Sequence, residues 1–141
     1  MTRIDFYVQA PDRLDVACRL VSKAFAAKNR VLVYAPDETI ARALDRLLWT
    51  TPAIGFVPHC MAHDRLAADT PVLIARDGDA PGHDDVLLNL HHEWPPFFPR
   101  FQRLLEVVGS EDDDKTAARA RFRAYRDRGY PIHTHDLARS E

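Results

Sequence analysis

The stretch VLVYAPD, residues 31–37, decides the fold class of this 141-residue chain. Its first five residues are an unbroken run of apolar strand formers, which is typical of a strand buried on both faces. Asp37 then stands at the N-cap of a helix, and the apolar residues that follow recur at helical spacing up to Pro52: Ile40, Ala43, Leu44, Leu47 and Leu48. A buried strand that leads directly into an amphipathic helix predicts an α/β fold.

Four other apolar runs are strand candidates: residues 4–8, 71–75, 85–90 and 104–108. The loop between 71–75 and 85–90 is too short for a helical crossover, so these two strands either run antiparallel or are not direct neighbours. We therefore predict one domain, residues 1–141, with a mixed, mostly parallel central sheet flanked by helices in a Rossmann-like three-layer arrangement. Residues 131–141 are assigned no element and are a candidate flexible tail.

Two further helices complete the pattern. Pro11 and Asp12 open the first, which is expected to end near Asn29. Ser110 is predicted to cap the last helix, with Asp113 as the acidic member of a capping box. The segment from Trp94 to Gln102 contains three prolines and is expected to form only short turns.

Composition excludes several classes of protein. With 46% hydrophobic and 28% charged residues, the chain is typical of a globular domain, and no apolar run approaches the ~20 residues that span a bilayer. The N-terminal residues lack the features of a signal peptide, so we expect a cytoplasmic protein. Cys18 and Cys60 are far apart and form no CxxC motif, which argues against a disulfide framework. A pI near 6.4 argues against bulk-charge binding to nucleic acid.

The glycines do not form a nucleotide-binding loop. There are only five, at positions 55, 78, 82, 109 and 129, and none belongs to a GxxxxGK[ST], GxGxxG or GxSxG motif. We expect neither a bound cofactor nor a catalytic nucleophile.

Three groups of histidines are candidates for a metal site or a cleft. His59, Cys60, His63 and Asp64 form the best candidate, for a metal-dependent hydrolase, but Pro58 disfavours the helix that their spacing requires, and a surface loop is the preferred interpretation. His133, His135 and Asp136 are expected to be solvated. His91 and His92 follow a strand directly, with no carboxylate partner evident, and are interpreted as a strand end. No metal site is predicted.

The most unusual stretch is KTAARARFRAYRDRGY, residues 115–130, which contains six cations and one acid in a chain of net charge −2. At ~100° per residue, four of its side chains fall within about 60° of one another on a helix: Lys115, Arg119, Phe122 and Arg126. Ala118 and Tyr125 point to the neighbouring, buried sector, whereas Arg121 and Arg128 are predicted to lie away on another side. The line of cations with one aromatic ring suits an acidic peptide with a terminal aromatic residue, single-stranded nucleic acid, or plain solvent.

A second candidate surface is LLWTTPAIGFVPH, residues 47–59. Large apolar residues surround two prolines here: Trp49, Ile54, Phe56 and Val57. They either plug the edge of the core or, if exposed together, form a protein interface.

These segments carry a family resemblance. DFYV (5–8), RVLVYAPD (30–37), LLWTTPAIGFVPH (47–59), DVLLNLHHEWPPFF (85–98) and RARFRAYRDRGY (119–130) resemble, in order, the chi subunit of bacterial DNA polymerase III. The resemblance covers nearly the whole chain.

The resemblance implies a non-catalytic accessory subunit of the polymerase III holoenzyme in DNA replication. Its partners would be the psi subunit, which links it to the clamp loader, and the acidic, phenylalanine-ended C-terminal tail of the single-stranded DNA-binding protein. By motif, Lys115, Arg119 and Phe122 would bind the tail, with Arg126 on the same line. Phe56 would bind psi, with Trp49 and Val57 as neighbours. The alternative hypothesis is direct binding of single-stranded DNA by the basic helix.

Overall fold

The computed structural model describes residues 1–51, 55–80 and 82–138. In these ranges the strands are β1 (Arg3–Ala10), β2 (Val31–Tyr34), β3 (His59–Met61), β4 (Val72–Ala75), β5 (Val86–Asn89), β6 (Arg103–Gly109) and β7 (Ile132–Asp136). The helices are α1 (Arg13–Ala26), α2 (Glu38–Thr50) and α3 (Asp112–Asp127), with short 3-10 turns at Ala67–Asp69 and Phe98–Arg100. None of the helices in this part of the chain could span a membrane.

The strands form one sheet in the order β3-β4-β2-β5-β6-β1-β7, and all of its pairings are parallel. The α/β class and the three layers are confirmed, but the predicted mixed sheet is wrong. β2 lies between β4 and β5, with Leu32 opposite Leu73 on one side and Leu87 on the other. The connection from β4 to β5, residues 76–85, needs no helix. Strands of four residues are only about 13 Å long, and ten extended residues are long enough to span that distance.

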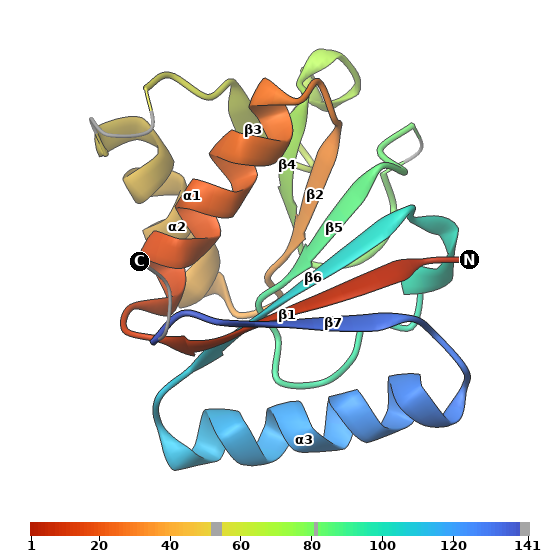
Figure 1. Ribbon diagram of the computed structural model, residues 1–141. Coiled ribbons are helices and arrows are strands. Elements are labelled where there is room, and N and C mark those ends of the chain that lie inside the picture. Colours follow the sequence, from red (N-terminus) through yellow and green to blue (C-terminus); the bar gives the residue numbers. More distant parts are fainter. Residues whose placement is uncertain (52–54, 81, 139–141) are drawn as a thin grey trace.

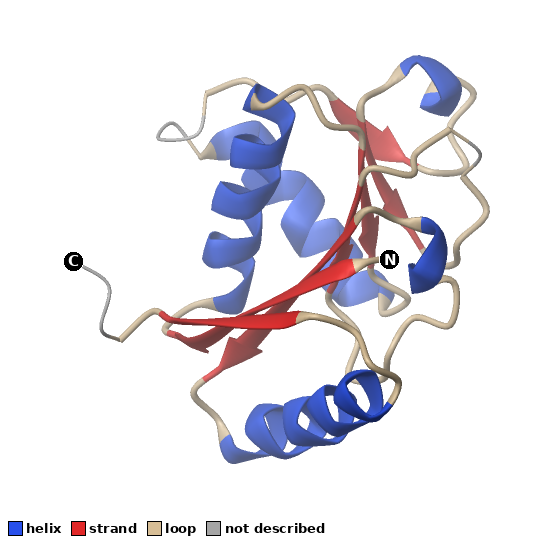
Figure 2. Cartoon of the chain, turned by 45° about the vertical axis from the view of Figure 1, so that its right-hand side comes forward, coloured by secondary structure: helices blue, strands red, loops and turns tan. Residues whose placement is uncertain are grey.

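Helices cover both faces of the sheet (Figures 1 and 2). α1 and α2 pack on the face to which Val31 and Val33 point. α3 packs on the opposite face, where Leu32 meets Ala118 and Tyr125 in a second core cluster. Because successive side chains of a strand point to opposite faces, one short apolar strand serves both clusters.

Two of the three helices begin where the sequence predicts, and the third does not. The Asp12 carboxylate accepts the backbone N–H groups of Leu14 and Asp15, and Asp37 does the same for α2. The predicted Ser110 cap is wrong, because β6 continues through Gly109 and the N-cap falls on Glu111, whose side chain makes no capping bond.

Both edge strands were missed by the sequence analysis. β3 has three residues, and β7 reads IHTHD, which is not an apolar run. β7 pairs with β1 along its whole length, so residues 132–136 are not the flexible tail that was expected. Residues 139–141 lie outside the described part of the chain.

Candidate functional site

A pocket of about 300 Å³ lies between α3 and the carboxyl ends of β1 and β6. Three of the four side chains predicted to lie along one line of the last helix are in its wall: Lys115, Arg119 and Phe122. The sheet contributes Phe6, Val8, Gln9, Val108, Gly109 and Thr134, and Ala118 completes the lining. The helical spacing therefore grouped three residues that the structure brings together around one pocket.

The sequence suggested an isolated ring among charges at Phe122, but in the structure this ring has an aromatic neighbour. It packs at 5.4 Å, centroid to centroid, against Phe6 of β1, and it is partly buried in the core cluster beneath α3. Phe6 is only 2% exposed, so it supports the ring of Phe122, and together the two rings form the apolar wall of the pocket.

The cations beside this wall are unpaired. Neither Lys115 nor Arg119 has an ion-pair partner among the residues that the structure describes, although α3 begins with three aspartates. Arg126, the fourth predicted residue, does not line the pocket and lies 3.3 Å from the carboxylate of Asp127. The pocket thus combines an aromatic wall with two available positive charges.

The strand side of the pocket was not predicted. Gln9 has a φ of 60°, unusual for a residue with a side chain, at the point where the register of β1 with β6 shifts. Thr134 belongs to β7, and no apolar run in the sequence predicts this strand. No pattern in the sequence marks Gln9 as a pocket residue.

Arg121 is in the core and not on the surface, which corrects the prediction. Its side chain is only 8% exposed, and its Nε donates to the fully buried carboxylate of Glu106 at 3.1 Å. Burial raises the pKa of Glu106, while Arg121, the Tyr125 hydroxyl and the Asn89 amide all act to lower it. A usable signal existed, since Arg121 follows Ala118 by three residues and precedes Tyr125 by four.

Trp49 and Phe56 form the second candidate surface. They are 58% and 68% exposed, and their ring centroids lie 5.8 Å apart. Gly55, directly before Phe56, has a φ of 70°, which a glycine adopts without strain. Val57 is 1% exposed and belongs to the core, so its side chain cannot contact a partner. Ile54 lies outside the described residues.

The ring of Trp49 is supported from below by His59, at a centroid distance of 4.6 Å. His59 is itself held by a 2.6 Å contact from Nδ1 to the carbonyl of Val57 and lies 3.2 Å from the Asp45 carboxylate. His59 is therefore a buried support for the aromatic pair.

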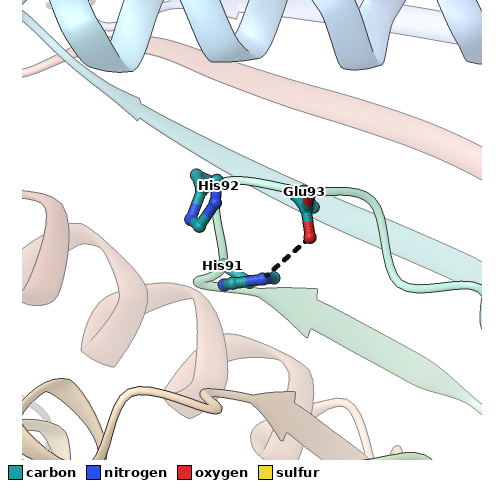
Figure 3. Close-up of side chains that lie close together, drawn as sticks. All are labelled: His91, His92 and Glu93. Atoms are coloured by element: carbon teal, nitrogen blue, oxygen red, sulfur yellow. Dashed lines mark ion pairs between the residues drawn. The ribbon is translucent and has the colours of Figure 1, made fainter.

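The predicted metal candidate at residues 59–64 is not assembled. Asp64 caps a turn by accepting the N–H of Leu66, and His63 is exposed. Within the described residues, three side chains do gather closely enough to hold an ion: His91, His92 and Glu93 (Figure 3). The sequence did not indicate a carboxylate partner for these histidines, whereas in the structure Glu93 bends back to within 3.6 Å of His91. Burial lowers the pKa of His91, and His92 acts in the same direction.

His135 is only partly exposed to solvent, because its ring has partners in the structure. Its ring stacks on Tyr7 at 4.5 Å, and its Nε2 lies 3.0 Å from the buried carboxylate of Asp5. Burial favours a raised pKa for Asp5, but hydrogen bonds from His135, Arg103 and Arg3 outweigh it and lower the pKa.

A larger hollow of about 540 Å³ lies at the ends of β2, β3 and β4, beside the start of α2. Its charged residues include the Glu38–Arg42 pair, which satisfies both charges internally. The smaller pocket is the better candidate for a ligand with an acid and an aromatic ring, because its cations stand beside Phe122. The described residues that line the larger hollow include Asp77 and Asp79 and no Phe, Tyr or Trp.

The comparisons with known proteins agree with one another. The family described as "DNA polymerase III chi subunit, HolC" matches residues 1–133. DNA polymerase III subunit chi of Pseudomonas aeruginosa is 42% identical over 144 residues, which cover 99% of each chain. The proteins of that name from Escherichia coli and Haemophilus influenzae are 32% and 29% identical over 84% and 87% of this chain and 82% and 86% of their own. The chain belongs to the family of DNA polymerase III chi subunits.

Proposed function

We propose that the protein is a non-catalytic accessory subunit of the DNA polymerase III holoenzyme that acts in cytoplasmic DNA replication as an adaptor. One surface, the pocket under α3, binds the C-terminal tail of the single-stranded DNA-binding protein. The other, formed by Trp49 and Phe56, binds the psi subunit and so links the protein to the clamp loader. Family membership supports the association with the polymerase.

The observation that carries the first assignment is the pair of free cations beside an aromatic wall. A peptide that ends in phenylalanine presents its ring and its terminal carboxylate on one residue. The ring would pack on Phe122, which the buried ring of Phe6 supports, and the carboxylate would reach Lys115 or Arg119. Hydrogen bonds to charged groups contribute about 1.5–3 kcal/mol each when desolvated and less when exposed, so the affinity is modest and salt-sensitive.

Direct binding of single-stranded DNA is the less favoured function. Burial of Arg121 removes one cation from the helix surface, and Arg128 lies 3.6 Å over the ring of Trp94. Phe122 lines a concave pocket instead of standing on an open face where successive bases stack.

A titration of the full-length protein with an acidic peptide ending in phenylalanine tests the tail site. The Arg119→Ala, Phe122→Ala double variant is expected to bind at least about tenfold more weakly, equivalent to about 1.4 kcal/mol. Arg123→Ala is the matched control, because Arg123 is exposed on the same helix but does not line the pocket. Undiminished binding by the double variant refutes the assignment, and an equal affinity for a bare oligonucleotide at low salt favours the DNA alternative.

Co-purification tests the psi surface. The Trp49→Ala, Phe56→Ala double variant should lose psi, because exposed aromatic residues are the usual anchors of interfaces. Leu66→Ala is the control, since Leu66 is equally exposed at 58% but lies elsewhere. Retention of psi by the double variant contradicts the proposal.

A further inference from the structure

His91, His92 and Glu93 follow β5 directly and turn their side chains toward one another (Figure 3). One potential ligand atom from each lies within 4.8 Å of the other two. We propose that these three residues bind a divalent transition-metal ion of the zinc class. The proposal is independent of the adaptor function, which uses neither this segment nor a metal.

The backbone of the segment is held by buried side chains. The Asn89 Oδ1 accepts the N–H of His91 at 2.9 Å, and the Asn89 Nδ2 donates to the carbonyl of Glu93 at 3.2 Å. Arg121 donates from Nη1 to the carbonyl of His92 at 2.7 Å. Each of the three candidate ligands is therefore anchored at its backbone by a residue of the Glu106 network, which reduces the entropy lost when an ion binds.

The side chains are also close to a binding geometry. Ligands that lie 2.0–2.2 Å from a tetrahedral zinc ion are about 3.3–3.6 Å from one another. The Nε2 of His91 is already 3.6 Å from the Glu93 carboxylate, and the His91 and His92 rings are 4.2 Å apart by centroid. The His91 ring packs in a T-shaped contact with Tyr34, at a centroid distance of 5.6 Å, which limits the rotation of this ring. Small rotations of the two exposed side chains, His92 and Glu93, would complete the three-ligand set.

The donor atoms select the class of ion. Two imidazoles and one carboxylate suit zinc, nickel or copper, whereas magnesium and calcium require mostly oxygen ligands. Three protein ligands leave a fourth position open to water or to a group from a partner.

Competition of the full-length protein with a fluorescent zinc chelator at pH 7.5 tests the site. The His91→Ala, His92→Ala double variant is expected to bind zinc at least about tenfold more weakly than the unmodified protein. The His63→Ala, His133→Ala double variant is the matched control, because both of these histidines are exposed and outside the cluster, and it should bind as the unmodified protein does.

Two further measurements make the test specific. Cobalt bound at this site should give the visible absorption of a tetrahedral ion without a thiolate charge-transfer band, and Cys60→Ser should leave zinc affinity unchanged. Equal zinc affinity of the unmodified protein and the His91→Ala, His92→Ala variant overturns the proposal, and so does loss of binding in Cys60→Ser. Thermal unfolding of each variant without metal separates loss of ligands from loss of fold.

Discussion

Replacing Arg121 with methionine tests the buried network that underlies both α3 and the segment after β5. The substitution keeps most of the volume of the side chain but leaves the Glu106 carboxylate fully buried without its cation. Removal of one partner of a buried ion pair costs about 3–5 kcal/mol. Tyr125 and Asn89 still hydrogen-bond to Glu106 in the variant, so we expect the lower half of this range at pH 7.

Protonation of Glu106 sets an upper limit to this loss of stability. In the variant, Glu106 can take up a proton and become neutral. Protonation costs about 1.36 kcal/mol for each pH unit above the usual pKa of about 4.3, which is about 3.7 kcal/mol at pH 7. The pKa of Glu106 is already raised by burial and rises further without Arg121. A raised pKa in the folded state means that stability is fully present below the unfolded pKa and is lost as the pH rises through the folded pKa. The penalty of Arg121→Met should therefore shrink by up to about 2.7 kcal/mol between pH 7 and pH 5.

Urea unfolding at the two pH values measures the effect. With a slope near 2 kcal/mol/M, the midpoint at pH 7 should fall by about 1.5–2 M. Arg119→Met is the control, because this exposed arginine of the same helix should change the free energy of unfolding by no more than about 0.5 kcal/mol. A loss below about 1 kcal/mol in Arg121→Met at pH 7, or a loss that is the same at pH 5, refutes the reasoning.

Three further predictions concern stability, each measured by chemical or thermal unfolding. Asp5→Asn should destabilise the protein at pH 7. Because the pKa of Asp5 is lowered in the folded state, the stability that its charge contributes is present above about pH 3.9 and is lost as the pH falls further, so variant and parent should converge in acid. Gly55→Ala should cost about 1 kcal/mol through its positive φ alone, since a Cβ there meets no atom within 4 Å; an unchanged midpoint contradicts this. Asp37→Ala should cost about 1 kcal/mol as a lost helix cap, while Ser110→Ala should cost almost nothing; equal losses would restore the Ser110 cap.

One side of the pocket under α3 follows from local helical spacing, and the other side depends on tertiary packing. The spacing of Lys115, Arg119 and Phe122 places them on one side of a helix wherever that helix packs. Phe6, which pairs with Phe122, is more than a hundred residues earlier in the chain and becomes its neighbour only through the packing of α3 on the sheet.

Exposure at the second surface also required the tertiary structure. Residues 47–59 include Trp49, Ile54, Phe56 and Val57, and this composition is compatible with either a core plug or an interface. Packing resolves the choice residue by residue, because Val57 fills the space under α1 and α2 whereas Trp49 and Phe56 remain in solvent.

By itself the sequence determined the α/β class, the buried strands, the aspartate caps of α1 and α2, and the placement of Lys115, Arg119 and Phe122 on one side of α3. These features depend on periodicity and hydrogen bonding within a few residues. Only the tertiary structure decided that the sheet is parallel throughout, that β3 and β7 form its edges, and that Arg121 is buried against Glu106. The physical reason is that strand direction, edge pairing and buried charge depend on partners brought from distant parts of the chain, and no local pattern records them.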